Sequence, residues 1–188
     1  EDGIRDLVRS RGLGDVYKRQ MYKATTTGWV EVNSAKTWST GGTYRFCNYN
    51  FGGQDDDETM YIVNGIDRAT EFTGTVFNTI TSGAPTNSDN PSLVVGYKKH
   101  LVLGIQSSLQ ISEVGNPNGY TVAGGAAEIA VGDTLTNLKE HTSALIVGCE
   151  DSTKSLYGNS RNNAGEFPPH VSILLRCIQF NNGGGRKK

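Results

Sequence analysis

The chain has 188 residues, and its 18 Lys and Arg are balanced by 19 Asp and Glu, so the net charge of −1 argues against electrostatic binding of nucleic acid. No run of about 18 or more apolar residues occurs, so the sequence predicts no membrane span. The three cysteines, Cys47, Cys149 and Cys177, are odd in number and far apart, which argues against a disulfide framework or a structural zinc site and favours a reducing compartment.

Residues 1–20 differ from the rest of the chain, because nine of the twenty are charged and no strand alternation is visible. The run from Asp15 to Gln20, DVYKRQ, resembles an in-frame translation of the transposon end sequence used to prepare shotgun sequencing libraries. The resemblance implies that residues 1–20 are a non-native, disordered, adapter-derived segment, and the alternative is a natural disordered N-terminus. Met21 is then either a true start or the first surviving codon.

From Met21 onward, short apolar or alternating runs are separated by Gly, Asn, Asp and Pro clusters, a pattern typical of strands and hairpins. The 24 glycines fit such a turn-rich β protein. One short helix is expected over residues 133–140. The predicted strands are residues 28–32, 43–49, 59–63, 69–72, 93–95, 100–103, 109–112, 127–131, 144–147 and 154–157.

Three segments share one layout, in which an apolar strand ends at Gly65, Gly104 or Gly148 and a polar turn and second strand follow. The glycines are 39 and 44 residues apart, a period that four-stranded β-propeller blades require. We therefore predict an all-β fold, an incomplete β-propeller of antiparallel blades over residues 21–160. The apolar strand would be an inner strand near the propeller axis, with Ile62, Leu103 and Ile146 at equivalent positions. A Greek-key β-sandwich is the alternative.

Six blocks of the sequence, in this order, resemble virion structural proteins of tailed bacteriophages. They span residues 61–74 (YIVNGIDRATEFTG), 97–103 (YKKHLVL), 109–117 (LQISEVGNP), 125–133 (GAAEIAVGD), 144–147 (ALIV) and 155–160 (SLYGNS). The resemblance implies a propeller-containing structural component of the phage tail or head-to-tail connector, of the tail-tubular or nozzle type. With only a few blades, the chain would be a fragment of a larger ring.

The same resemblance implies how such a protein would act. Its partners would be other virion tail or connector subunits, and the full-length protein would form a homo-oligomeric ring. Its place would be the virion, assembled in the host bacterial cytoplasm, with no membrane and no specific nucleic-acid site. The blade pattern is lost over residues 161–188, for which a frameshift or join near Arg161 and a natural edge strand with a basic end both remain open.

A search for catalytic chemistry singles out few residues. His100, His141 and His170 have no surrounding motif and are expected to be solvated or turn-bonded. Cys47 and Cys149 are expected to be small buried residues without an activating base. Gly124 and Gly125 are expected at a tight corner, since no Lys-Ser/Thr pair follows them as in a phosphate-binding loop. The sequence therefore predicts no enzyme and no catalytic, cofactor-binding or metal-binding residue.

Two clusters have a possible binding role. Residues 55–58 (DDDE) could hold Ca²⁺ but lack the ligand spacing of an EF-hand, so a solvated loop is favoured. The aromatic residues Trp29, Trp38, Tyr44 and Tyr49 could stack on a sugar, although packing is favoured. The alternatives to an assembly protein are thus a carbohydrate- or receptor-binding propeller, with an exposed Trp beside carboxylates, and a propeller hydrolase.

Overall fold

The computed structural model describes residues 21–32, 36–53, 58–142, 144–157 and 174–178. These residues form antiparallel β-sheets with no α-helix, only a 3-10 turn at Val122–Gly124. The strands are β1 (Tyr22–Thr25), β2 (Gly28–Glu31), β3 (Arg45–Tyr49), β4 (Thr59–Val63), β5 (Thr70–Phe72), β6 (Phe77–Thr79), β7 (Leu93–Tyr97), β8 (His100–Ile105), β9 (Ser108–Ile111), β10 (Ala127–Ala130), β11 (Leu135–His141), β12 (Ala144–Cys149), β13 (Thr153–Tyr157) and β14 (Leu174–Ile178).

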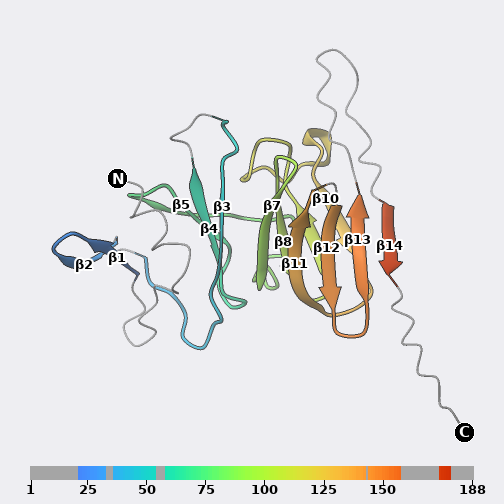
Figure 1. The fold of residues 1–188 in the computed structure, drawn as a ribbon, viewed down its shortest axis with the longest axis horizontal. Coiled ribbons are helices and arrows are strands. Elements are labelled where there is room, and N and C mark those ends of the chain that lie inside the picture. The colour runs from blue at the N-terminus through green and yellow to red at the C-terminus, as the bar shows by residue number, and fades with distance from the viewer. Residues whose placement is uncertain (1–20, 33–35, 54–57, 143, 158–173, 179–188) are drawn as a thin grey trace, which may run out of the picture.

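Each sheet is built from strands that follow one another in the chain (Figure 1). A two-stranded ribbon, β1–β2, precedes three four-stranded sheets, which we call the first sheet (β3–β6), the second sheet (β7–β10) and the third sheet (β11–β14). All neighbouring strands are antiparallel, and in the described part of the chain no sheet contains the out-of-order neighbour of a Greek key.

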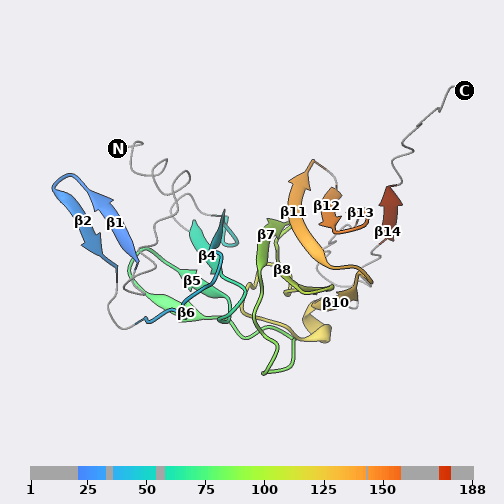
Figure 2. The same cartoon turned by 90° about the horizontal axis from the view of Figure 1, so that it is seen from below.

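The sheets pack face to face in chain order (Figure 2). We call the face of a sheet toward the preceding element its leading face and the opposite one its trailing face. Tyr61 and Val63, on the trailing face of the first sheet, pack against Leu101 and Leu103 of the second. The trailing face of the second sheet packs in the same way against the third, in a cluster that includes Val102, Leu109, Leu145 and Val147. Both faces of the second sheet are therefore buried, which explains the uncharged run in β8.

The first strands approach one another most closely across the sheets, since β7 lies against β3 on one side and β11 on the other. The apolar strands β4, β8 and β12 are the second strand of each sheet, so each has a neighbour on both sides. Gly96 in β7 allows the close approach: a Cβ there would lie 2.1 Å from Cδ2 of Tyr49 in β3.

The helix expected over residues 133–140 is wrong, because residues 135–140 belong to β11. Leu135 and Leu138 are both buried against the second sheet, although a three-residue spacing is also that of one face of a helix. In β11 a register shift between Leu135 and Asn137 adds one residue to the strand. The extra residue turns both leucines to the same face, as a bulge does.

The repeat is present, but the glycine anchors are not equivalent. Gly104 and Gly148 lie within strands, whereas Gly65 follows β4 in a turn with φ +77°. Ile62 and Leu103 both lie on leading faces, but Ile146 lies on a trailing face, because its neighbours Leu145 and Val147 pack against the second sheet. Strand side chains alternate, so an alignment wrong by one residue reverses the face.

Candidate functional site

The residues weighed for catalysis do not come together. In the ranges that the structure describes, no group of three or more His, Cys, Asp or Glu side chains could hold a metal ion. Residues 55–57 of the acidic run and His170 lie outside the described residues. His141 is exposed at the end of β11. His100 is buried rather than solvated, and its Nδ1 lies 2.6 Å from the carbonyl oxygen of Ser112, the residue that follows β9.

The two described cysteines with placed side chains are half-buried rather than fully buried. Cys47 Sγ accepts a hydrogen bond from the backbone N–H of Gly96 at 3.2 Å, which links the first sheet to the second. Burial raises the pKa of the Cys47 thiol, opposite to the shift that activates a nucleophile. Cys47 is thus a structural contact.

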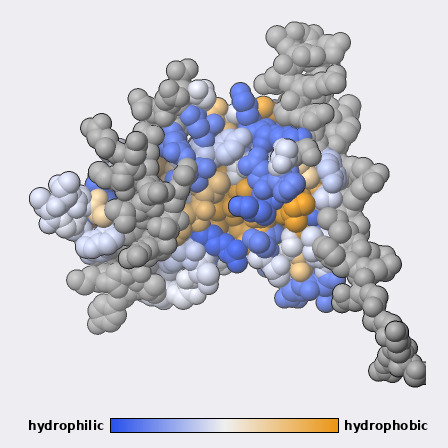
Figure 3. Space-filling model, viewed as in Figure 1, coloured by the Kyte–Doolittle hydropathy of each residue, from blue (hydrophilic) through white to orange (hydrophobic). Residues whose placement is uncertain are grey.

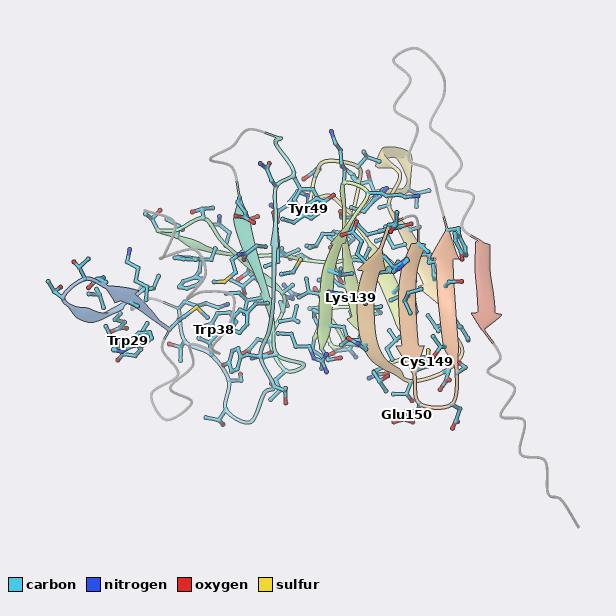
Figure 4. The ribbon with its side chains drawn as sticks, in the orientation of Figure 1. Trp29, Trp38, Tyr49, Lys139, Cys149 and Glu150 are labelled. Atoms are coloured by element: carbon cyan, nitrogen blue, oxygen red, sulfur yellow. The ribbon has the colours of Figure 1, made fainter. Side chains whose placement is uncertain are left out.

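The four aromatic residues fall into different environments (Figure 4). Trp38 is 2% exposed and packs edge-on against Tyr44 and Phe77, with the ammonium of Lys36 4.8 Å from its ring centroid. Tyr49 packs beside Phe51. The packing interpretation holds for these residues.

Trp29 is the exception among the four. It lies on β2 of the ribbon and is 62% exposed. The register of the ribbon pairs Ala24 with Trp29 and Tyr22 with Glu31, so these four residues share one face. The ribbon therefore places an exposed indole on the same face as the Glu31 carboxylate, whose Oε1 is buried.

Carboxylates hold the connections between strands in a recurring arrangement that the sequence analysis missed. The backbone N–H and hydroxyl of Ser39 both donate to Asp67, at 2.8 and 2.6 Å. Ser82 donates its N–H and hydroxyl to Asp89 in the same way, at 3.1 and 2.6 Å. In a third instance, the hydroxyl of Ser152 donates to Asp133 at 2.7 Å.

For Asp67 and Asp133, these hydrogen bonds favour the charged form of the carboxylate. Partial burial alone would raise the pKa of Asp67, but the bonds from Ser39 and Asn64 outweigh it and lower that pKa. The bond from Ser152 lowers the pKa of Asp133. Each carboxylate is thus already satisfied by the protein. The only sequence signal was the run Asn64 to Asp67, in which Asn64 Oδ1 accepts the N–H groups of Ile66 and Asp67, as in an Asx turn.

Apolar side chains also reach the surface. On the face drawn in Figure 3, they gather over β7 and the strands on either side of it. The leading face of the first sheet is apolar as well, where Phe46 and Met60 remain half-buried beside the buried Ile62. Such surfaces suit contacts with further protein.

No model of a known protein family matches the chain, and a comparison with curated proteins finds no significant match. Within the described residues, no helix has the length and apolar character that a membrane crossing needs. The surfaces described above are therefore the basis for a functional proposal.

Proposed function

We propose that this chain is a structural component of a phage tail or head-to-tail connector that acts by subunit assembly. In this proposal the three sheets are blades of an incomplete β-propeller, and the full-length protein forms a homo-oligomeric ring within the virion. The order of the six phage-like sequence blocks supports the assignment, and they span the strands from β4 to β13.

One structural observation carries the proposal. Three consecutive sheets each have four antiparallel strands in chain order, and each packs face to face on the next. This is the unit from which propellers are built by repetition. An assembly role needs no reaction centre, only surfaces that bury area between subunits, and the apolar faces described above are of that kind.

The test is localisation on a particle. Antibodies against residues 21–157 should label one end of phage particles whose genome carries this gene, at the tail or the neck. Electron microscopy of the purified full-length product should show rings. Labelling confined to the capsid shell, or a full-length product that remains a monomer, would contradict the proposal.

The exposed Trp29 favours one alternative, a carbohydrate- or receptor-binding propeller. The exposed indole face of Trp29 can stack on a sugar ring, and Glu31 lies on the same face of the ribbon. In a glycan array, the wild-type chain would bind a sugar and Trp29→Ala would lose it. Val30→Ala is the control, because Val30 is 47% exposed on the opposite face. An array without any bound glycan rules this alternative out.

A further inference from the structure

The β1–β2 ribbon repeats one local structure of the four-stranded sheets. In the first and second sheets, the residue just after the fourth strand donates its N–H to the carbonyl just before the third strand. Ile80 donates to Ala69 at 2.8 Å, and Val131 donates to Ser107 at 2.8 Å. In the ribbon, Val32 follows β2 and donates to Met21, just before β1, at 2.7 Å. The β11–β12 pair makes the same bond, from Glu150 to Thr134 at 3.0 Å, so it is the packing of the ribbon that makes β1 and β2 equivalent to the third and fourth strands of a sheet.

Burial follows the same equivalence. Val32, Ile80 and Val131 are all buried, at 6%, 1% and 4% exposure. Ala69 and Ile80 pack against the leading face of the second sheet, and Met21 packs in the same way against Ile62 on the leading face of the first. The ribbon thus lies on the first sheet as β5–β6 lie on the second.

The connections that lead from one sheet to the next agree in length in part. Residues 32–44 join β2 to β3 and residues 80–92 join β6 to β7, thirteen residues each, whereas the shorter residues 131–134 join β10 to β11. In both long connections, a serine donates its N–H and hydroxyl to an aspartate, Ser39 to Asp67 and Ser82 to Asp89.

What the ribbon lacks is the inner half of a sheet. In the described part of the chain, β1 pairs only with β2, whereas β5 and β9 each have a partner on both sides. A two-stranded ribbon is marginally stable in water, and an open strand edge is a template for further pairing. The ribbon also projects from one end of the molecule (Figures 1 and 2).

The leading face of the first sheet, beside the ribbon, is less completely buried than the leading face of the second sheet. On the leading face of the second sheet, Leu101 and Leu103 are fully buried beneath side chains of β3 and β4. On the leading face of the first sheet, Phe46 and Met60 are only half-buried. A hairpin placed beside β1, as β3–β4 are placed beside β5, would cover them.

We propose that β1–β2 is the outer half of a fourth four-stranded sheet, and that the open edge of β1 binds an antiparallel hairpin of the β3–β4 type. This hairpin leads directly into Met21 in the same polypeptide, as β4 leads through the turn before Ala69 into β5. Residues 1–20 do not fit this role, because they lack strand alternation and are shorter than the counterpart, residues 45–68. The inference depends on the sheet repeat and not on the phage assignment.

The test replaces residues 1–20 with a copy of residues 45–68 in the otherwise complete chain. Hydrogen exchange of the Ala24 amide should slow by about tenfold or more, because this N–H points away from β2, toward the edge that the added hairpin would pair. The matched control carries the change Ile62→Pro within the added copy, which removes strand pairing there, and should not slow exchange. Equal exchange in the two extended chains would overturn the proposal.

A second measurement uses the unextended chain. The Ala24 amide, which points away from β2, should exchange faster than the amides of β5 and β9 that face β4 and β8. If β1 is as well protected as β5, the ribbon needs no partner, and the proposal is wrong even where the extended chain fails to fold.

Discussion

At the scale of single residues, the connections are held by hydroxyl and backbone N–H groups that donate to one carboxylate. Ser39 uses both of its donors on Asp67, and Asn64 Nδ2 adds a third bond at 2.8 Å. These contacts join the segment before β3 to the turn after β4, two places 28 residues apart. A charged acceptor with three donors fixes this loop, so its loss should be measurable.

We expect Ser39→Ala to lower the free energy of unfolding by about 1–2 kcal/mol at neutral pH, because two bonds to a charged acceptor are weakened or lost. Urea denaturation measures the change. Ser107→Ala is the control, since Ser107 is exposed, and it should be near neutral. A cost equal to that of the control would mean that the Asp67 contacts do not stabilise the fold.

Lowering the pH should remove the stabilisation that the Asp67 carboxylate provides. The folded-state pKa of Asp67 lies below its ordinary value of 3.8, so its stabilising effect is fully present above that value and disappears as the pH falls through the folded-state pKa. The stability difference between wild type and Asp67→Asn should therefore shrink below about pH 4. Thermal unfolding at several pH values tests this, and a difference independent of pH contradicts it.

A substitution at Gly96 tests whether the close approach of β7 to β3 is needed for stability. Gly96→Ala should destabilise the fold by about 1–3 kcal/mol or more, because the new Cβ would overlap the Tyr49 ring and force β3 and β7 apart. Gly148→Ala is the matched strand control, since its Cβ would meet nothing closer than 3.4 Å. Adding Tyr49→Ala should make the Gly96→Ala cost smaller, a coupling that a double-mutant cycle measures.

At the scale of elements, alternation within a strand decides which side chains carry the packing. Leu145 and Ile146 are adjacent in β12, but Leu145 is fully buried against the second sheet, whereas Ile146 is partly exposed on the trailing face. Leu145→Ala should lower the free energy of unfolding by about 2–5 kcal/mol, and Ile146→Ala should lower it clearly less. Equal losses in chemical denaturation would mean that the faces are assigned wrongly.

Much of the strand content could be predicted from the sequence, because apolar runs such as residues 59–63 are bounded by turn residues. β6 (Phe77–Thr79) was missed because a three-residue edge strand carries almost no pattern. In β11 a bulge puts two leucines on one face at a three-residue spacing, which does not distinguish a strand from a helix. The pairing of Ser39 with Asp67 could not be predicted, since it depends on how distant segments meet.

At the scale of the whole molecule, the core is a series of interfaces between neighbouring sheets, so the loss of one sheet exposes one face. A chain that ends at Gly132 lacks the third sheet and uncovers Leu109 and Val102 on the trailing face of the second. It should bind the dye ANS and aggregate. In stacked architectures each unit contacts only its neighbours, so the first sheet should remain folded.

The fluorescence emission of Trp38, which packs with Ile62 of the first sheet, reports whether that sheet remains folded. The sequence has two tryptophans, and in a Trp29→Phe background only the buried Trp38 reports. Its emission should stay at short wavelength in the shortened chain. A shift to long wavelength would show that the sheets unfold as one cooperative unit.

The connections between third and fourth strands vary widely, although the strands on either side stay antiparallel. They comprise residues 26–27, 73–76 and 112–126, so the same hairpin is closed by two, four or fifteen residues. Loop closure costs rise only slowly with length, which makes such sites tolerant of insertion. A foreign peptide spliced at the exposed Thr26–Thr27 turn would therefore be displayed on the protein surface while the sheets beneath it keep their pairing.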